Sequence, residues 1–204
     1  TFWFVYGDLM NKYARAEPHS GFTHLKQIIS LAGKDKKHWI YHSGIDTLYE
    51  QSGFKNVMQA KGCVFDWQCK KCGRLERVLP KQFSLDRIRG VAENIPLCDG
   101  CGKVMRPNIN MRGDLDWDDR KATKQATALE KFLARDDIRK HSVTVLEIGA
   151  GPAQPLAREY AEQFLKNDKY RCCLIRINPV KERTSQFANE HATFDQLVKK
   201  NRVA

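Results

Sequence analysis

The sequence predicts an α/β protein: a partial Rossmann-like parallel sheet with an inserted four-Cys zinc ribbon. One observation behind this prediction is a pair of apolar runs over 142–151 and 170–178, separated by a helical pattern over 155–166. Apolar runs that do not alternate with polar residues are typical of parallel strands covered on both faces. The other observation is a pair of Cys-x-x-Cys motifs in the middle of the chain.

Shorter elements are predicted in the rest of the chain. Apolar residues keep helical spacing over 1–32, where Thr23 is placed to cap the second of two helices. Short apolar runs and glycine breaks predict, in order, a strand over 38–42, a short helix over 46–51 and a strand over 56–60. An amphipathic helix is expected over 121–140.

These elements divide the chain into two expected domains. A Rossmann-like α/β domain, lacking its first strand–helix segment, would comprise 1–61 and 107–204. The zinc ribbon would be an insertion over 62–106. With 204 residues, the chain is long enough for one core domain that carries a small insertion.

The strongest local signal is the set of four cysteines in the two motifs, Cys69, Cys72, Cys98 and Cys101, with 25 residues between the motifs. Four thiolates close a tetrahedral shell around zinc at Zn–S distances of about 2.3 Å. A glycine follows each motif, where the turn requires a positive φ. We therefore predict a structural zinc ion held by these cysteines; a redox dithiol and a coincidental pair of disulfides are the alternatives. Such a closed site leaves no open position for catalysis.

The composition favours an intracellular protein without a membrane span. No run reaches the roughly 18 apolar residues that a span requires. Seven cysteines, four of them in metal spacing, are typical of a reducing compartment rather than of a secreted disulfide framework. The chain opens at Thr1, which is compatible with a removed import signal, so a mitochondrial location is the expectation.

The charge balance is strongly basic, with 35 Lys and Arg against 24 Asp and Glu and a net charge of +11. An excess of this size favours acidic surfaces or nucleic acid as partners. Nine basic residues cluster around the expected zinc ribbon and form a candidate phosphate-binding surface: Lys70, Lys71, Arg74, Arg77, Lys81, Arg87, Arg89, Lys103 and Arg106. A solvated surface is the alternative explanation.

A glycine turn, Gly149-Ala150-Gly151, ends the first long apolar run, at the edge where open α/β sheets bind ligands. Glycines there let backbone N–H groups approach a phosphate or ribose. The string VLEIGAGPA is also similar to the first motif of S-adenosylmethionine-dependent methyltransferases, so a methyltransferase-like domain is one alternative. However, the next strand ends in Asn178-Pro179, without the acidic residue that would bind the ribose.

Taken together, these segments resemble the sirtuin family of NAD-dependent protein deacylases over much of the chain. Five segments match in the family's order: Tyr41 with Ile45-Asp46, Lys61-Gly62, the zinc ribbon, Arg106-Pro107 with Arg112-Gly113-Asp114, and Gly149-Ala150-Gly151 with Ile177-Asn178. The cofactor-binding residues that this resemblance implies are Ser43, Ile45, Asp46, Gly149, Gly151 and Asn178.

This sequence differs from the family's motifs at positions that the resemblance assigns to catalysis and to cofactor binding. Lys61 stands where the resemblance implies a catalytic histidine, and a protonated lysine cannot act as a general base. Ser43-Gly44 replaces a Gln-Asn pair, and Ala150-Gly151 replaces two hydroxyl side chains. The family's opening segment, which cradles the NAD pyrophosphate, has no counterpart before residue 20, so the sequence leaves NAD a doubtful cofactor.

The leading functional hypothesis is therefore a catalytically inactive sirtuin-like zinc-binding module. It would serve as a structural or interaction subunit of a larger assembly, with other protein subunits as partners. The alternative is an active NAD-dependent deacylase or ADP-ribosyl transferase that uses another base. His42 and a desolvated Lys61 are the nearby candidates for that base.

Overall fold

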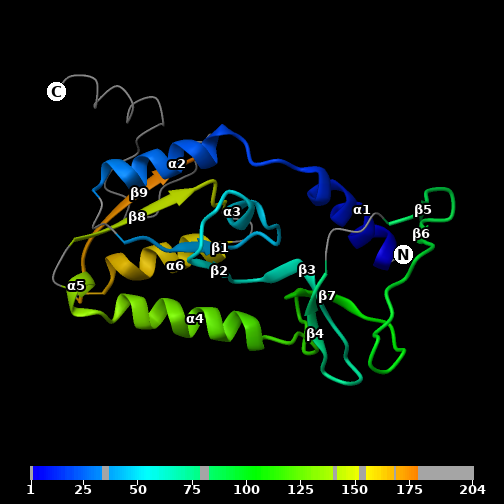
Figure 1. Ribbon diagram of the computed structural model, residues 1–204. Helices are drawn as coiled ribbons and strands as arrows, with labels where there is room; N and C mark the ends of the chain where they lie inside the picture. Colours follow the sequence, from blue (N-terminus) through cyan, green and yellow to red (C-terminus); the bar gives the residue numbers. More distant parts are fainter. Residues whose placement is uncertain are drawn as a thin grey trace. The chain divides into compact units, whose positions relative to one another are not determined.

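The computed structural model describes residues 2–33, 37–78, 83–139, 142–151, 155–167 and 169–178 (Figure 1). The chain forms two compact units, Thr1–Thr127 and Ala128–Ala204. None of the helices in the described residues is long and apolar enough to cross a membrane.

The first unit opens with the two helices that apolar spacing predicts, α1 (Phe2–Arg15) and α2 (Ser20–Leu31). Thr23 was expected to cap α2, and this expectation is wrong. The cap is His19, whose Nδ1 accepts a hydrogen bond from the backbone N–H of Gly21 at 3.0 Å. A histidine side chain therefore satisfies the free N–H that Ser, Thr, Asp or Asn more often satisfies.

A parallel strand pair follows, built from β1 (Ile40–His42) and β2 (Val57–Gln59), with α3 (Leu48–Gln51) between them. The register pairs His42 with Gln59, so both strands end at the same edge. The backbone N–H of Ala60 continues this ladder with a 2.9 Å hydrogen bond to the carbonyl of His42. The expected strand–helix–strand order is confirmed here.

The part of the chain that was expected to be a zinc ribbon contains a three-stranded antiparallel sheet and a small hairpin. The sheet has the order β4 (Leu75–Arg77), β3 (Gly62–Gln68), β7 (Arg106–Ile109), with β3 in the centre. The hairpin consists of β5 (Leu85–Asp86) and β6 (Val91–Ala92). The name zinc module is used below for residues 62–109. Whether the insertion has the limits expected from the sequence stays a prediction.

Helix α1 packs on this zinc module and completes its core. Trp3 stacks on Phe83 with ring centroids 5.4 Å apart and meets Trp67 edge-on at 5.5 Å. The amide of Asn11 makes hydrogen bonds to both the backbone N–H and the carbonyl of Phe83. At Gly7 an added Cβ would lie 2.9 Å from the Phe83 ring, so only glycine lets the helix come this close. Aromatic packing and backbone recognition therefore fix α1 to the module.

The second unit contains the predicted parallel strands. Helix α4 (Arg120–Leu133) leads the chain into it and is followed by α5 (Asp136–Arg139), so the single helix expected over 121–140 is divided. Two aspartates in the first turn of α5 favour a new helix start there. Strands β8 (Ser142–Ile148) and β9 (Arg171–Ile177) pair in parallel over their whole length, with α6 (Leu156–Leu165) as the crossover.

Asp66 holds the first unit together at the centre of β3. Its side chain is 3% exposed and pairs with Arg77 of β4 at 2.5 Å and with Lys121 of α4. A carboxylate removed from water in this way is stable only while both cations remain in place.

We expect the Asp66→Asn variant to lower the free energy of unfolding by about 1–3 kcal/mol, because the amide loses two charged hydrogen bonds while remaining buried. Urea denaturation would measure the change. Glu130→Gln makes the same chemical change at an exposed position of α4 and should stay within about 0.5 kcal/mol of the parent protein. Equal effects of the two substitutions would contradict this account.

Candidate functional site

The two Cys-x-x-Cys turns have the same backbone design. In the first, the carbonyl of Cys69 accepts a hydrogen bond from the N–H of Gly73 at 2.9 Å. In the second, the carbonyl of Cys98 accepts the corresponding bond from Gly102 at 2.7 Å. Both glycines have positive φ, 70° and 67°, as the sequence predicted. Each turn therefore presents its two sulfurs on the same side.

The structure brings the four predicted ligands together. Their sulfur atoms all lie within 4.8 Å of one another, and the Cys69–Cys101 and Cys72–Cys98 Sγ–Sγ distances are both 3.5 Å. Tetrahedral Zn–S bonds of about 2.3 Å require sulfurs about 3.8 Å apart, so the cluster fits zinc. Four sulfurs and no oxygen or nitrogen donor are the set that zinc prefers in structural sites. In the described residues no other group of at least three His, Cys, Asp or Glu side chains has such spacing.

The pKa values of Cys69 and Cys72 shift in opposite directions. Hydrogen bonds to Cys69, first of all from the backbone N–H of Cys72, lower its pKa to about 6. The backbone N–H of Arg74 acts to lower the pKa of Cys72, but the neighbouring sulfurs of Cys98 and Cys69 outweigh it and raise that pKa to about 11. Without metal the cluster therefore holds at least one proton near neutrality, and metal binding must release it.

We expect the purified protein to contain one zinc ion per chain and Cys98→Ser to contain none, because three sulfurs leave the shell open. Metal analysis and thermal denaturation are the measurements. The zinc content and the melting temperature should both be lower in Cys98→Ser than in the parent protein. Affinity for zinc should also weaken as the pH is lowered, since protons compete for the thiolates. Cys172→Ser, in β9 and outside the cluster, is the matched control. A zinc content in Cys98→Ser equal to that of the parent would contradict the assignment.

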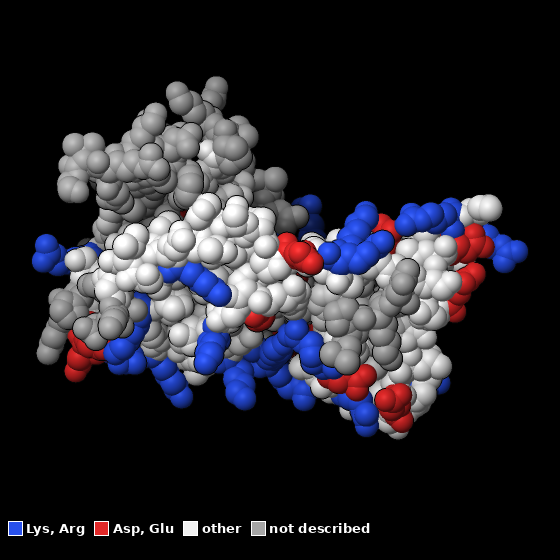
Figure 2. All heavy atoms as spheres, turned by 45° about the horizontal axis from the view of Figure 1, so that its top comes forward, with Lys and Arg blue, Asp and Glu red and all other residues white. Residues whose placement is uncertain are grey.

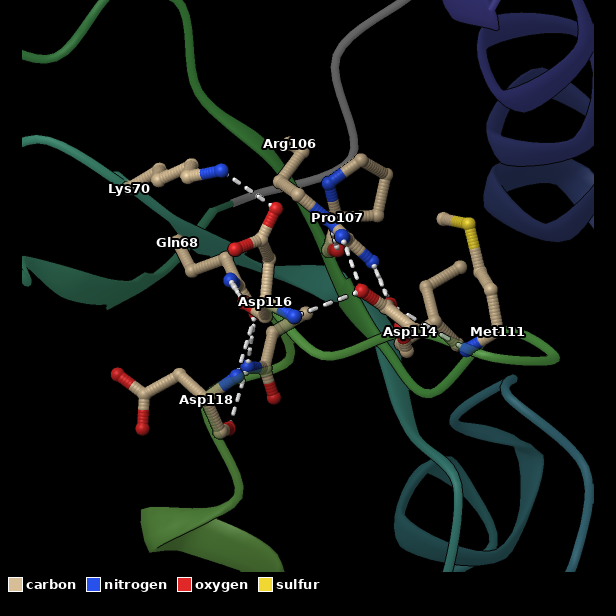
Figure 3. Close-up of polar contacts among 10 residues, drawn as sticks. Gln68, Lys70, Arg106, Pro107, Met111, Asp114, Asp116 and Asp118 are labelled. Atoms are coloured by element: carbon tan, nitrogen blue, oxygen red, sulfur yellow. Dashed lines mark hydrogen bonds and ion pairs between the residues drawn. The ribbon is translucent and has the colours of Figure 1, made fainter.

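A loop between β7 and α4 is fastened to the first cysteine turn (Figure 3). Arg106 binds Asp114 through two hydrogen bonds of 2.9 and 2.5 Å, and these hold the pKa of Asp114 below its usual value. Lys70, inside the cysteine turn, contacts Asp116 at 2.6 Å. The side chain of Gln68 donates to the carbonyl of Asp116 and accepts from the N–H of Asp118. Sequence analysis missed Gln68, since nothing in its local sequence marks a residue that bridges two segments.

The Lys61-Gly62 turn lies between β2 and β3, and its backbone has a strict steric requirement. Gly62 has a φ of +78°, and a Cβ there would lie 2.1 Å from the carbonyl oxygen of Asn108 on β7. The N–H of Asn110 donates to the carbonyl of Lys61 at 2.9 Å. The backbone of the turn is therefore held against the neighbouring strand β7. These contacts involve the backbone of Lys61 and not its side chain.

This requirement can be isolated with two glycines of similar backbone conformation. Gly90 has a φ of +65° but open space around its missing Cβ, so Gly90→Ala should cost only about 1 kcal/mol of stability. Gly62→Ala adds a clash with backbone and should cost roughly 3 kcal/mol or more. Chemical denaturation of both variants is the measurement. A Gly62→Ala variant as stable as Gly90→Ala would rule out the steric lock.

Three of the predicted cofactor residues lie after β1. Ile45 packs against the core, and its carbonyl accepts from the N–H of Val64 at 2.9 Å. Asp46 accepts hydrogen bonds from His42 Nε2 at 3.2 Å and from the N–H of Leu48 at 2.9 Å. Burial acts to raise the pKa of Asp46, but these hydrogen bonds outweigh it and hold the pKa below its usual value. Ser43 is half-buried.

The other three cofactor residues surround the glycine turn of the second unit. Gly149 has a φ of +67°, and its N–H donates to the carbonyl of Ile177 at 2.9 Å. Asn178 Nδ2 donates to the carbonyl of Ala150 at 3.0 Å, which closes the turn that ends in Gly151. Arg158 Nη2 donates to the same carbonyl at 3.0 Å, a residue that sequence analysis missed.

A buried ion pair joins the two strands that end at this turn. Arg176 of β9 faces Glu147 of β8 in the strand register, with hydrogen bonds of 2.5 and 2.8 Å, and also contacts Glu162 of α6 at 3.0 Å. The predicted cofactor residues therefore form two groups, one in each unit. Each group lies at the carboxyl end of a parallel strand pair.

The candidate nucleic-acid surface is largely neutralised by carboxylates. Six of its nine basic residues have an acidic partner, in the pairs Lys70–Asp116, Arg74–Glu76, Arg77–Asp66, Arg87–Asp8, Arg89–Asp86 and Arg106–Asp114. Lys81 lies outside the described residues, and Lys71 and Lys103 make no ion pair within them. Figure 2 shows acidic side chains interspersed with the basic ones, and a row of Lys and Arg along the lower edge. These ion pairs reduce the free positive charge of the surface, and nucleic acid as a partner stays a prediction.

The model of the Sir2 family matches residues 4–133. The chain belongs to the Sir2 family. Among curated sirtuins, an NAD-dependent protein deacylase of Pyrococcus abyssi is 25% identical over 112 residues, which make up 55% of this chain and 42% of the relative. An NAD-dependent protein deacetylase of Thermotoga maritima is 34% identical over 73 residues, or 34% of this chain and 26% of the relative. The chain thus spans less than half the length of these relatives.

Solved sirtuin structures share the fold. A Sir2 homologue–NAD complex superposes with a TM-score of 0.68 at 18% identity and covers 98% of this chain and 71% of its own. A Sir2 structure bound to acetylated peptide gives 0.62 at 19% identity, with coverage of 94% and 71%. At these identities the likeness shows the fold alone, and it confirms the predicted Rossmann-like α/β architecture. The methyltransferase-like alternative receives no support.

Proposed function

We propose that this chain is a sirtuin-like zinc-binding module without deacylase chemistry, acting as a structural or interaction subunit of a larger assembly. The observation that carries the proposal is Lys61 at the position matched to the family's histidine. The backbone of that turn is intact, since Gly62 keeps the close approach to Asn108. A lysine ordinarily holds its proton at neutral pH and cannot remove one from a ribose hydroxyl.

Preservation of the scaffold supports the same proposal. The four sulfurs, the packed β3 strand and the parallel pair β8–β9 are all in place. The zinc cluster would hold the cysteine turns together and thereby the loop bound by Lys70 and Gln68. A four-sulfur site is saturated, so the metal would stabilise structure and take no part in a reaction.

NAD binding is a separate matter from deacylation. The relatives are named as NAD-dependent enzymes and one structural neighbour is an NAD complex, so they give no support to the doubt about NAD raised by the sequence. We therefore propose NAD as the ligand to test. A place in a mitochondrial complex, with protein subunits as partners, stays a prediction.

One observation favours a second candidate function, an active NAD-dependent deacylase or ADP-ribosyl transferase. His42 Nε2 lies 3.2 Å from Asp46 Oδ2, and the carbonyl of His42 accepts a hydrogen bond from the N–H of Ala60, the residue before Lys61. A histidine oriented by a carboxylate is the usual form of a general base. His42 would then replace the missing family histidine from the adjacent strand.

An assay of nicotinamide release separates the two candidates. Full-length protein, incubated with NAD and an acylated peptide, should release nicotinamide no faster than a blank without protein, because no general base stands at position 61. Release above the blank would contradict the proposal. Loss of that release in His42→Ala, with retention in the control His24→Ala on α2, would establish the second candidate. Calorimetric titration with NAD tests cofactor binding independently of turnover.

A further inference from the structure

The imidazole of His42 occupies the space that a side chain at position 44 would need. A Cβ added to Gly44 would lie 2.5 Å from His42 Cε1, 2.7 Å from its Nε2 and 3.0 Å from Asp46 Oδ2. Carbon atoms do not approach ring atoms this closely without displacing them. Gly44 has no positive φ, so the crowding and not the backbone conformation demands a glycine here.

Several contacts hold the imidazole in this position. Its Nε2 lies 3.2 Å from Asp46 Oδ2, and its ring meets Tyr49 at 5.1 Å with an interplanar angle of 69°. Asp46 is fixed in turn, because Leu48 donates to its other carboxylate oxygen and Gln59 donates to its carbonyl. The side chains of His42 and Asp46 are only 13% and 17% exposed. A rotation of the imidazole away from Gly44 would therefore break the contact with a buried carboxylate.

The place of this pair in the fold gives it a functional meaning. His42 is the last residue of β1 and Gln59 the last of β2, and these two paired residues mark the carboxyl ends of parallel strands. Ligands of α/β proteins bind at such ends. The carboxylate of Asp46 would be the acceptor for a ligand amide there, but the imidazole of His42 already engages it.

We propose that His42 is the specificity-determining residue of this site and closes it to carboxamide ligands. It fills the volume beside Gly44 and keeps Asp46 in an internal contact, so a carboxamide must displace the imidazole to bind. The inference rests on the proposed function only in the choice of nicotinamide and NAD as probes. It implies two independent obstacles to sirtuin chemistry, and Lys61→His alone would leave the site closed.

A double-mutant cycle tests the steric coupling without any ligand. Gly44→Ala should lower the melting temperature of the parent protein by roughly 4 °C, since its methyl group collides with the imidazole. In the His42→Ala background the same substitution should shift the melting temperature by less than about 1 °C, because the imidazole is gone. Equal shifts in the two backgrounds would overturn the proposal. The cycle does not depend on activity, so its outcome is separate from that of the deacylase assay.

Binding of the probes tests the functional part. We expect His42→Ala to bind nicotinamide and NAD at least tenfold more tightly than the parent in calorimetric titrations, because Asp46 becomes available as an acceptor. His24→Ala, on α2, should bind as the parent does. Unchanged affinity in His42→Ala, including no detectable binding by either protein, would overturn the proposal. NAD-dependent deacylation by the parent would contradict both the proposed function and the closure of the site to carboxamides, while the double-mutant cycle would still report on the steric contact.

Discussion

Burial of strand β3 is the constraint on which the rest of the first unit depends. All seven of its residues are buried, so its polar side chains are stable there mainly where they find partners; Trp67 Nε1 is buried without a hydrogen-bond partner among the described residues. Asp66 meets two cations, Trp67 meets the aromatic ring of Trp3, and Gln68 binds the loop that precedes α4. The strand begins at the locked Gly62 turn and leads directly into Cys69, the first cysteine of the four-sulfur cluster. One strand thus links the Lys61-Gly62 turn to that cluster.

Ion pairs accompany many of the cations in this protein of net charge +11. Around the zinc module most basic side chains lie beside a carboxylate, and several of these pairs tie separate segments together. Arg87 joins the hairpin to α1 through Asp8, and Lys70 joins a cysteine turn to Asp116. Surface pairs of this kind contribute little stability one by one. Net charge alone is therefore a poor guide to a nucleic-acid partner.

Residues of the scaffold and residues of the candidate ligand site meet different physical requirements in this sirtuin. Backbone geometry requires a glycine at position 62, and metal coordination would require the four cysteines. Replacing any of these residues would lower the stability of the fold. Under the proposed function, the side chains of Lys61 and His42 bear on proton transfer and ligand contact rather than on backbone geometry. His42 also shows that one substitution requires another, since its imidazole is accommodated only by a glycine at position 44.

Local sequence was enough to predict the elements that depend on near neighbours. The runs over 142–151 and 170–178 predicted the strands that the structure places at Ser142–Ile148 and Arg171–Ile177, and the cysteine turns with their positive-φ glycines and the family were also predicted. Sequence analysis misplaced the cap of α2 and extended α4 through a break, since end signals such as His19 are weak. Only the tertiary structure decided which distant residues meet. The packing of α1 on the module, the cations beside Asp66 and the imidazole over Gly44 depend on the path of the whole chain, and no local pattern encodes them.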